Sequence, residues 1–301
     1  MKALLSCLSK QSKKPGQIII ADGGHNLQPL VAEFYEKLDV ECLYCPQAGQ
    51  ILQRNFALQH LHQHIKVVIY LDDDHSFDED FISGFVEAWE KESKVGQKPL
   101  GGMNSSTYNL RSFKGGLIRR LFFLTTHQKG QVSCSGFATP VGPVDESVEV
   151  EWLFGGATAW CRDVLDRHPH PLSFPTIWAT CEDVMFSYPL GKKYRLLVTE
   201  KASTFHFENY NEMSYRQARF YGLSAAIMRY HFVRQNDDLL TLAYFWMTFA
   251  VVLGNFGKSI FGSRRHLGLF VGGLRGLCAA IVCTILNRQS RPLAMSLPKE
   301  Y

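Results

Sequence analysis

Short apolar runs alternate with amphipathic segments over the first quarter of the chain. The runs at residues 17–21 and 66–71 are rich in β-branched residues, the run at residues 40–45 is mostly apolar, and all three predict strands. Between them, apolar residues at helical spacing predict helices over residues 27–37 and 50–62. Because strands and helices alternate in this order, we expect an α/β fold with a mostly parallel central sheet and crossover helices.

The middle third of the chain has a different pattern. Ser76 is placed to cap a helix whose Phe81, Ile82, Phe85 and Trp89 share one face. Beyond it, glycine and proline crowd residues 96–116 and 130–142, which predicts loops with short strands. In open α/β sheets, loops at the carboxyl ends of strands form the ligand crevice.

The last third becomes helical and strongly apolar. Residues 239–256 contain no charged side chain, and residues 267–286 are apolar apart from Arg275. Mid-depth in a bilayer, that charge costs roughly 2.5–3.5 kcal/mol on insertion scales. The pattern is compatible with a membrane hairpin, a pair of helices in the plane of the membrane or a soluble helical subdomain. We therefore expect a catalytic domain over residues 1–210 and a helical, membrane-associating region over residues 211–301.

Composition narrows the class of protein. The net charge of +4 over 301 residues is too small to predict a nucleic-acid partner. The eight cysteines are scattered, and Cys42 and Cys45 point to opposite faces of a predicted strand, so neither a disulfide scaffold nor a zinc site is expected. The apolar stretches at the start are too short for a signal peptide, so we expect a cytoplasmic protein.

A strand that ends in three consecutive aspartates is the first candidate for chemistry. Asp72, Asp73 and Asp74 follow the apolar run 66–71, at the carboxyl edge of the predicted sheet. Carboxylates this close repel one another and are commonly held ionised by a bound cation; Mg²⁺ or Mn²⁺ suits oxygen ligands. The alternative at this point is a solvated acidic turn before the next helix.

Three further segments carry candidate residues. Glu182 and Asp183 lie among apolar and aromatic residues, which suits a general base but equally the first turn of a helix. Gly155 and Gly156 form a small-residue loop that lets the backbone approach a ligand closely. His206, between two phenylalanines, is by itself more typical of a hydrogen-bonded core residue.

Taken together, these segments resemble the family 2 glycosyltransferases, whose catalytic domain has the GT-A fold. The matching segments, which occur in the family's order over roughly residues 1–210, are I-I-I-A-D-G-G, P-Q-A-G-Q-I-L-Q-R-N-F-A-L, Y-L-D-D-D, F-G-G-A, C-E-D-V and F-H-F. The resemblance implies a GT-A type nucleotide-sugar-binding domain that transfers a sugar from a nucleotide-diphosphate donor. Nucleotidyltransferases of related architecture have a Gly-rich loop with Arg and Lys near the start, which this sequence does not show.

The resemblance also implies a role for individual residues. For the donor site, it implies that Asp22 contacts the nucleotide base, that Arg54 and Asn55 line the pocket, and that Asp72 begins the D-x-D pair. It implies that Asp74 is the direct metal ligand and that His206 completes the metal or diphosphate site. On the acceptor side, it implies that Asp183 is the catalytic base and that Gly155, Gly156 and Glu182 belong to the acceptor loop.

From this resemblance we expect an inverting, metal-dependent hexosyltransferase that uses Mg²⁺ or Mn²⁺. Its acceptor is expected to be a glycan or a lipid-linked intermediate of cell-envelope or exopolysaccharide synthesis, at the cytoplasmic face of the membrane. The sequence departs from the family at its start. The family begins with a central strand of the type V-x-V-I-x-P-T-x-N-R, whereas Met1 is placed at the helix that follows. The alternative is a truncated, catalytically inactive protein with this fold that acts as a binding module.

Overall fold

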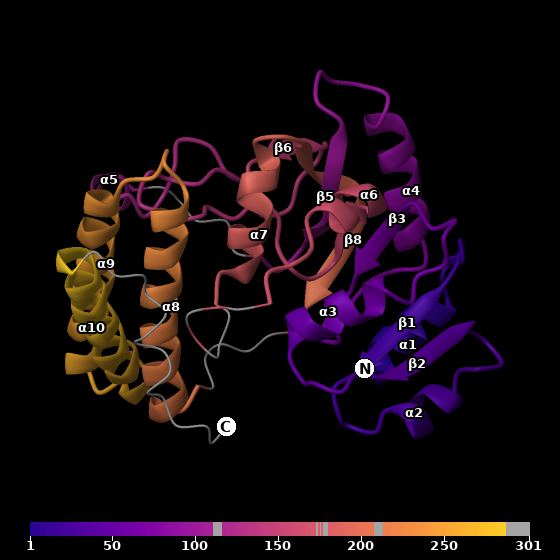
Figure 1. Cartoon of the computed structure of the whole chain (residues 1–301), viewed down its shortest axis with the longest axis horizontal. Coiled ribbons are helices and arrows are strands. Elements are labelled where there is room, and N and C mark those ends of the chain that lie inside the picture. Colours follow the sequence, from indigo (N-terminus) through magenta and orange to yellow (C-terminus); the bar gives the residue numbers. More distant parts are fainter. Residues whose placement is uncertain (111–115, 173, 175, 177–179, 208–212, 287–301) are drawn as a thin grey trace. The chain divides into compact units, whose positions relative to one another are not determined.

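The computed structural model describes residues 1–110, 116–172, 174, 176, 180–207 and 213–286. The chain forms two compact units (Figure 1). The first contains residues 1–112, 141–172 and 186–208, and the second contains residues 113–140, 173–185 and 209–301. The boundary that we predicted between residues 210 and 211 lies outside the described residues.

The predicted βα alternation is present at the start of the first unit. Three predicted strands are confirmed to within two residues, while the helix expected over 27–37 is shorter because turns replace its second half. Ser76 does not cap the next helix. It belongs to a short strand that pairs with Phe205, and Asp80 precedes the helix instead. The elements are α1 (Lys2–Ser9), β1 (Ile18–Asp22), α2 (Gln28–Ala32), β2 (Val40–Tyr44), α3 (Gln50–Leu58), β3 (Val67–Tyr70), β4 (His75–Ser76) and α4 (Phe81–Glu92).

A six-stranded mixed sheet forms the centre of the first unit. The strand order is β3-β7-β5-β8-β4, and β6 also pairs with β8. Strands β3, β5 and β8 run parallel, with β7 antiparallel between β3 and β5, so the predicted α/β class is confirmed. The remaining elements of this unit are β5 (Leu100–Thr107), β6 (Val148–Val150), β7 (Thr158–Cys161), α6 (Arg162–Arg167), the latter part of α7 (Glu182–Gly191) and β8 (Arg195–His206).

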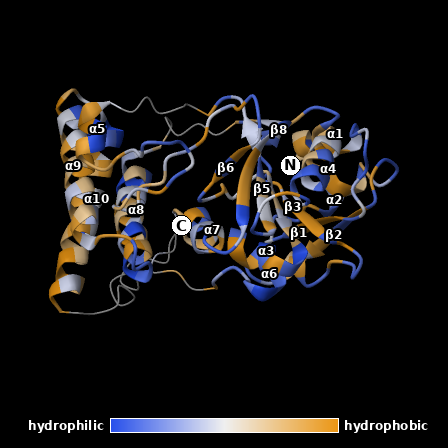
Figure 2. Ribbon diagram, turned by 90° about the horizontal axis from the view of Figure 1, so that it is seen from above, coloured by the Kyte–Doolittle hydropathy of each residue, from blue (hydrophilic) through white to orange (hydrophobic). Residues whose placement is uncertain are grey.

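Strand β5 lies within residues 96–116, the stretch for which we expected loops with short strands. Its glycines permit close packing rather than a turn, because a Cβ added to Gly102 would lie 2.7 Å from Leu153 Cδ1 and 2.9 Å from Trp160 Cε3. Apolar clusters cover the sheet. One packs α1 and α4 around Leu5, Phe81 and Met103, and the other packs α6 and α7. Figure 2 shows α1 and α4 on one side of the strands and α3 and α6 on the other.

Strands β1 and β2 form a separate two-stranded parallel sheet. In the described part of the chain, β1 pairs with β2 alone and β3 pairs with β7 alone, so each has one edge without a neighbouring strand. The idea that a strand is missing before α1 stays a prediction at this point.

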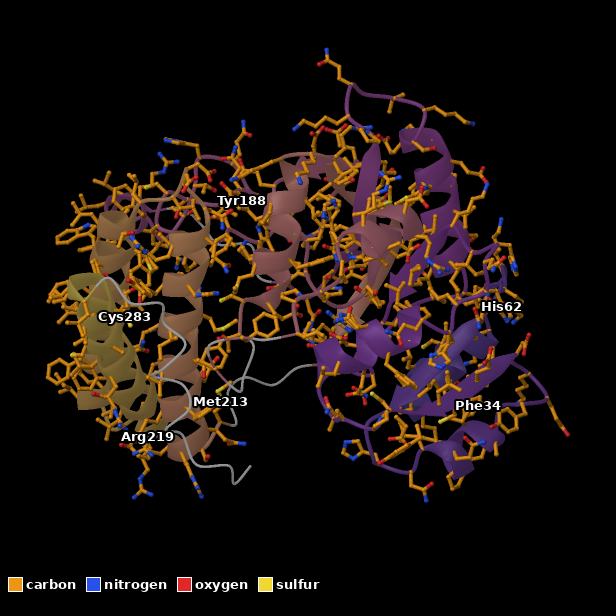
Figure 3. The ribbon with its side chains drawn as sticks, viewed as in Figure 1. Phe34, His62, Tyr188, Met213, Arg219 and Cys283 are labelled. Atoms are coloured by element: carbon orange, nitrogen blue, oxygen red, sulfur yellow. The ribbon has the colours of Figure 1, made fainter. Side chains whose placement is uncertain are left out.

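The second unit contains α5 (Leu117–Leu121), α8 (Tyr215–Gln235), α9 (Thr241–Ile260) and α10 (Arg264–Ile285). Glycines bring α10 close to α8: a Cβ at Gly272 would lie 1.9 Å from the carbonyl oxygen of Arg219, and one at Gly276 would lie 2.6 Å from Ala226 Cβ. Arg219 and Cys283 mark these two helices in Figure 3. Among the described residues, α10 is the one helix that is long and apolar enough to cross a membrane.

Candidate active site

An aspartate and two histidines meet where β4 pairs with the end of β8. The antiparallel register places His75 opposite His206, and their rings stack with centroids 4.6 Å apart. Asp74 lies between them: its Oδ2 is 3.0 Å from His206 Nε2 and its Oδ1 is 3.2 Å from His75 Nδ1. One potential ligand atom from each of the three residues lies within 4.8 Å of the others. The structure therefore places Asp74 and His206 together, as the resemblance implied, and adds His75.

The electrostatics of this cluster favour an ionised carboxylate. The hydrogen bond with His206, and then the adjacent His75 imidazole, hold the pKa of Asp74 well below its usual range. Asn109 fixes the backbone of His206, because its Oδ1 accepts a bond from the His206 N–H at 3.0 Å. A negative carboxylate between two imidazoles is a set of donors that suits a divalent cation.

Arg54 and Asp72 form the second part of the site. Arg54 is buried on α3, and its Nη2 donates to Asp72 Oδ1 at 3.1 Å and to the carbonyl oxygen of Gly155 at 3.0 Å. Gln50, one turn earlier, donates to the same Asp72 oxygen at 3.0 Å. The guanidinium also lies over the ring of Tyr70, 5.3 Å from its centroid. Helix α3 therefore holds Asp72 in one orientation and ties it to the glycine loop.

Gly156 joins the two parts. A Cβ at this position would lie 2.7 Å from Asp72 Oδ2 and 2.7 Å from His75 Cε1, so the loop backbone lies directly against both side chains. Asn104 supports the loop from β5: its Nδ2 donates to Thr158 Oγ1 at 2.7 Å and its Oδ1 accepts from the N–H of Phe154 at 2.8 Å. This close approach explains why residue 156 is a glycine. The role of Gly155 and Gly156 in acceptor binding stays a prediction.

Asp22 ends β1 and is buried. Its carboxylate accepts backbone N–H groups of Gly24, His25 and Leu27 at 2.7–2.9 Å, and these bonds, that of Leu27 above all, lower its pKa. The residue therefore shapes the turn before α2. Contact with a nucleotide base stays a prediction for it.

Asn55 contacts a residue that also lies near Arg54. Its Nδ2 donates to the carbonyl oxygen of His170 at 2.9 Å, and the Arg54 charge contributes to lowering the pKa of the same histidine. The ring of His170 stacks on Phe186 with centroids 3.7 Å apart, and burial lowers its pKa to about 3. The predicted donor contact of Asn55 is untested, and its visible contact is with the backbone.

Glu182 and Asp183 lie in the first turn of α7, in the part of that helix that groups with the second unit. Asp183 Oδ1 accepts the N–H of Val184 at 2.8 Å, and the preceding Cys181 has a positive φ of 66°. Both carboxylates thus lie in the first turn of a helix, which was our alternative to a role as general base. Trp178, one of the aromatic residues near them in the sequence, lies outside the described residues.

Three residues of this site were not identified from the sequence: His75, Gln50 and Asn104. His75 directly follows the aspartate run and could have been found as a further ligand type beside it. Gln50 and Asn104 lack a comparable signal, because their roles depend on contacts between segments far apart in the chain.

Residues 1–139 match the family model described as Glycosyl transferase family 2. Curated protein sequences give no match. A crystal structure of GalNAc-T7 with UDP, GalNAc and Mn²⁺ is similar at 14% identity and a TM-score of 0.51, over 93% of this chain and 49% of that one. The structure of S. aureus TarS 1-349 with UDP-GlcNAc has a TM-score of 0.46 at 13% identity, over 94% of this chain and 87% of that one. The structure of the same protein with UDP has a TM-score of 0.49 at 15% identity, over 97% of this chain and 81% of that one.

This chain spans about half the length of the GalNAc-T7 chain. At 14% identity that likeness concerns the fold, whereas the family match concerns the sequence of the first 139 residues. The chain therefore has the GT-A fold of glycosyltransferases, and its first 139 residues match family 2 of these enzymes.

Proposed function

We propose that this protein is a metal-dependent inverting glycosyltransferase that moves a sugar from a nucleotide-diphosphate donor to a hydroxyl group of a glycan or lipid-linked acceptor. The observation that carries the proposal is the Asp74–His75–His206 cluster, which lies beside the Arg54–Asp72 pair at the carboxyl edge of β3. This is the edge at which open α/β sheets bind ligands.

The residues of the cluster fit a divalent cation. Asp74 supplies an ionised oxygen donor, and His75 and His206 supply nitrogen donors within reach of the same point. Mg²⁺ prefers oxygen ligands, so the two imidazoles favour Mn²⁺ among the two ions that we expected. When bound, the ion would neutralise charge on the departing nucleoside diphosphate.

The chain's own residues would orient the donor around this point. Arg54 and Gln50 hold the Asp72 carboxylate, and the backbone of Gly156 leaves room for a ligand next to it. Asp22 shapes the neighbouring turn at the end of β1. GalNAc-T7 was crystallised with UDP and Mn²⁺, and we propose a uridine or similar nucleoside diphosphate for this chain as well.

Asp183 is our proposed base. It takes the proton of the acceptor hydroxyl as that oxygen attacks the anomeric carbon, while the bond from this carbon to the diphosphate breaks on the opposite face, which inverts the configuration. Asp183→Asn should lower transfer by at least about 100-fold and leave donor affinity unchanged. Asp163→Asn, at an exposed carboxylate on α6, is the matched control and should leave both unchanged. Comparable turnover by the two variants would remove Asp183 from the mechanism.

The helices of the second unit motivate the location that we propose, the cytoplasmic face of a membrane that carries envelope or exopolysaccharide intermediates. Helix α9 exposes apolar side chains at alternating spacings of three and four residues, and Figure 2 shows hydrophobic residues along α9 and α10. Basic residues follow at the turn between these helices and suit anionic lipid headgroups. The exposed apolar residues of α9 are Leu242, Trp246, Phe249, Leu253, Phe256 and Ile260.

A thermal-shift screen of UDP, GDP, TDP and their sugars, with and without Mn²⁺, tests the donor proposal. At 100 times its Kd a ligand stabilises by about 2.7 kcal/mol, and at roughly 2–4 °C per kcal/mol one nucleotide should raise Tm by about 5–10 °C in the presence of Mn²⁺. His206→Ala should remove the Mn²⁺-dependent part of this shift, whereas His62→Ala, at an exposed histidine, should keep it. Absence of any nucleotide shift would favour the binding module.

A further inference from the structure

We propose that the second unit binds an anionic membrane surface through one apolar face, formed by α5 and α9, and that none of its described helices crosses the bilayer. Of the three arrangements that the sequence leaves open, this is the pair of helices in the plane of the membrane. The proposal deepens the membrane location proposed above and does not depend on the sugar-transfer step. The apolar face consists of the six exposed residues of α9 named above together with Leu117, Ile118 and Leu121 of α5.

Trp246 joins the two helices into one face. Its indole Nε1 donates to the carbonyl oxygen of Leu121 at 3.0 Å, and its ring stacks on Phe122 with centroids 4.9 Å apart. Leu117 and Ile118 precede this contact on α5 and are 85% and 73% exposed. Both views show α5 beside α9 (Figures 1 and 2). A contiguous group of large exposed apolar side chains marks an interaction surface, in contrast to apolar residues that are exposed singly.

The apolar face runs along the whole of α9. Its residues on this helix extend from Leu242 to Ile260, a distance of about 27 Å at the rise of an α-helix. The opposite side of α9 packs inside the protein, with Tyr244 and Met247 fully buried. A helix with one exposed apolar stripe and one protein-facing side suits the plane of a membrane, because the whole stripe then lies at one depth.

Helix α10 is long and apolar enough to cross a membrane, but its contacts with α8 oppose crossing. A Cβ at Gly268 would lie 2.5 Å from the carbonyl oxygen of Tyr215, and Tyr230 Oη lies 2.8 Å from Thr284 Oγ1. The two helices therefore pack closely from the start of α10 to its last turn. Since arginine is strongly disfavoured in the hydrocarbon core, α10 cannot enter it together with α8 and cannot enter it alone without losing this packing. The exposed arginines of α8 are Arg216, Arg219 and Arg234.

The charges around the apolar face favour anionic lipid over a second copy of this chain. Residues 116–140 and 239–286 contain basic side chains but no aspartate or glutamate. Arg120 is exposed on α5, and Lys258 and Arg264 are exposed near the turn between α9 and α10. A symmetric dimer through this face would bring such groups together without an acidic partner from either segment. Anionic headgroups supply the opposite charge.

Co-sedimentation of the full chain with vesicles tests the face. Binding to phosphatidylcholine vesicles with about 30% phosphatidylglycerol should be at least tenfold stronger than to phosphatidylcholine alone. The double variant Leu117→Asp, Ile118→Asp should weaken binding at least tenfold, since it removes two apolar side chains from the contact, and should keep the parent's Tm because both are exposed. Arg120→Gln should weaken it by about fivefold. Leu172→Asp, at an exposed leucine of the first unit, is the matched control and should bind as the parent does.

Washing cell membranes with alkaline carbonate tests the topology, because it releases proteins that lie on the surface and leaves spanning proteins in the pellet. We expect release, and retention would overturn the proposal. Vesicle binding by the double variant equal to that of the parent would also overturn it. If that variant has a lowered Tm, Leu117→Ser is measured in its place.

A self-association interface has its own signature. A parent that ignores vesicles and elutes as a dimer, which the double variant converts to a monomer, would replace the lipid by a second copy of this chain. Vesicle binding is measured without donor, metal or acceptor, so a chain without transferase activity still tests the membrane face. A chain that transfers sugar and ignores anionic vesicles would overturn this proposal alone.

Discussion

Replacing Gly156 by alanine tests whether the loop backbone, Asp72 and His75 form one packed site. The new Cβ would lie 2.7 Å from Asp72 Oδ2 and 2.7 Å from His75 Cε1, closer than side-chain carbons approach other atoms. Neither neighbour can move freely: Asp72 is held by Arg54 and Gln50, and the ring of His75 is buried against His206. Overpacking of this kind costs about 1–3 kcal/mol.

We therefore expect Gly156→Ala to lower Tm by about 2–12 °C and to weaken binding of Mn²⁺ with nucleoside diphosphate at least tenfold, about 1.4 kcal/mol. Calorimetric titration and a thermal melt measure the two effects. Gly257→Ala on α9 is the matched control, since an added Cβ there meets no atom within 4 Å and alanine favours the helix. A Gly156→Ala protein with the parent's Tm and affinity would refute the packing argument.

Three further predictions concern separate parts of the molecule. Asp74→Asn should weaken Mn²⁺ binding by about 10- to 100-fold, measured by the free-ion signal in electron paramagnetic resonance; unchanged binding would place the ion elsewhere. The pKa of His170 is about 3 in the folded protein, whereas its ordinary value, which applies to the unfolded chain, is 6.5. As the pH falls below 6.5 the unfolded chain therefore binds a proton that the folded protein does not, and this favours unfolding. Urea unfolding should thus show a loss of about 2 kcal/mol from pH 8 to pH 5, which His170→Phe abolishes; an equal loss in that variant would assign the effect to other groups. Leu253→Asp on α9 should reduce co-sedimentation with anionic vesicles without lowering Tm, and undiminished sedimentation would argue against a membrane contact through this face.

The βα alternation could be predicted because it depends on local periodicity. Residues 17–21 and 66–71 are rich in β-branched side chains, residues 40–45 are mostly apolar between Asp39 and Pro46, and each of the three contains a strand in the structure. Strand β5 was expected only in general terms, as a short strand among loops, and the position of this strand was not predicted for a physical reason. Its Gly101 and Gly102 make room for Tyr194, Leu153 and Trp160, and a sequence pattern does not distinguish a glycine that permits packing from one that permits a turn.

The candidate site was predictable as a set of residue types but not as a set of contacts. Asp74 and His206 were expected from the resemblance, yet their meeting depends on the pairing of β4 with β8, which are far apart in the chain. The same pairing places the ring of His75 against that of His206, and the aspartate motif alone does not predict this orientation. Asp22 has an additional local role, since three backbone N–H groups bond to its carboxylate.

Helix α3 links the two separate sheets of the first unit. Gln53 Nε2 donates to the carbonyl oxygen of Ala21 in β1 at 2.5 Å, while Gln50 and Arg54 bond to Asp72 at the end of β3. These side chains fix the carboxyl ends of β1 and β3 with respect to each other, a task that backbone hydrogen bonds perform when neighbouring strands pair directly. Side-chain bonds yield more readily than a paired sheet, so the spacing between the Asp22 turn and the Asp72–Asp74 run is softer than a continuous sheet would make it.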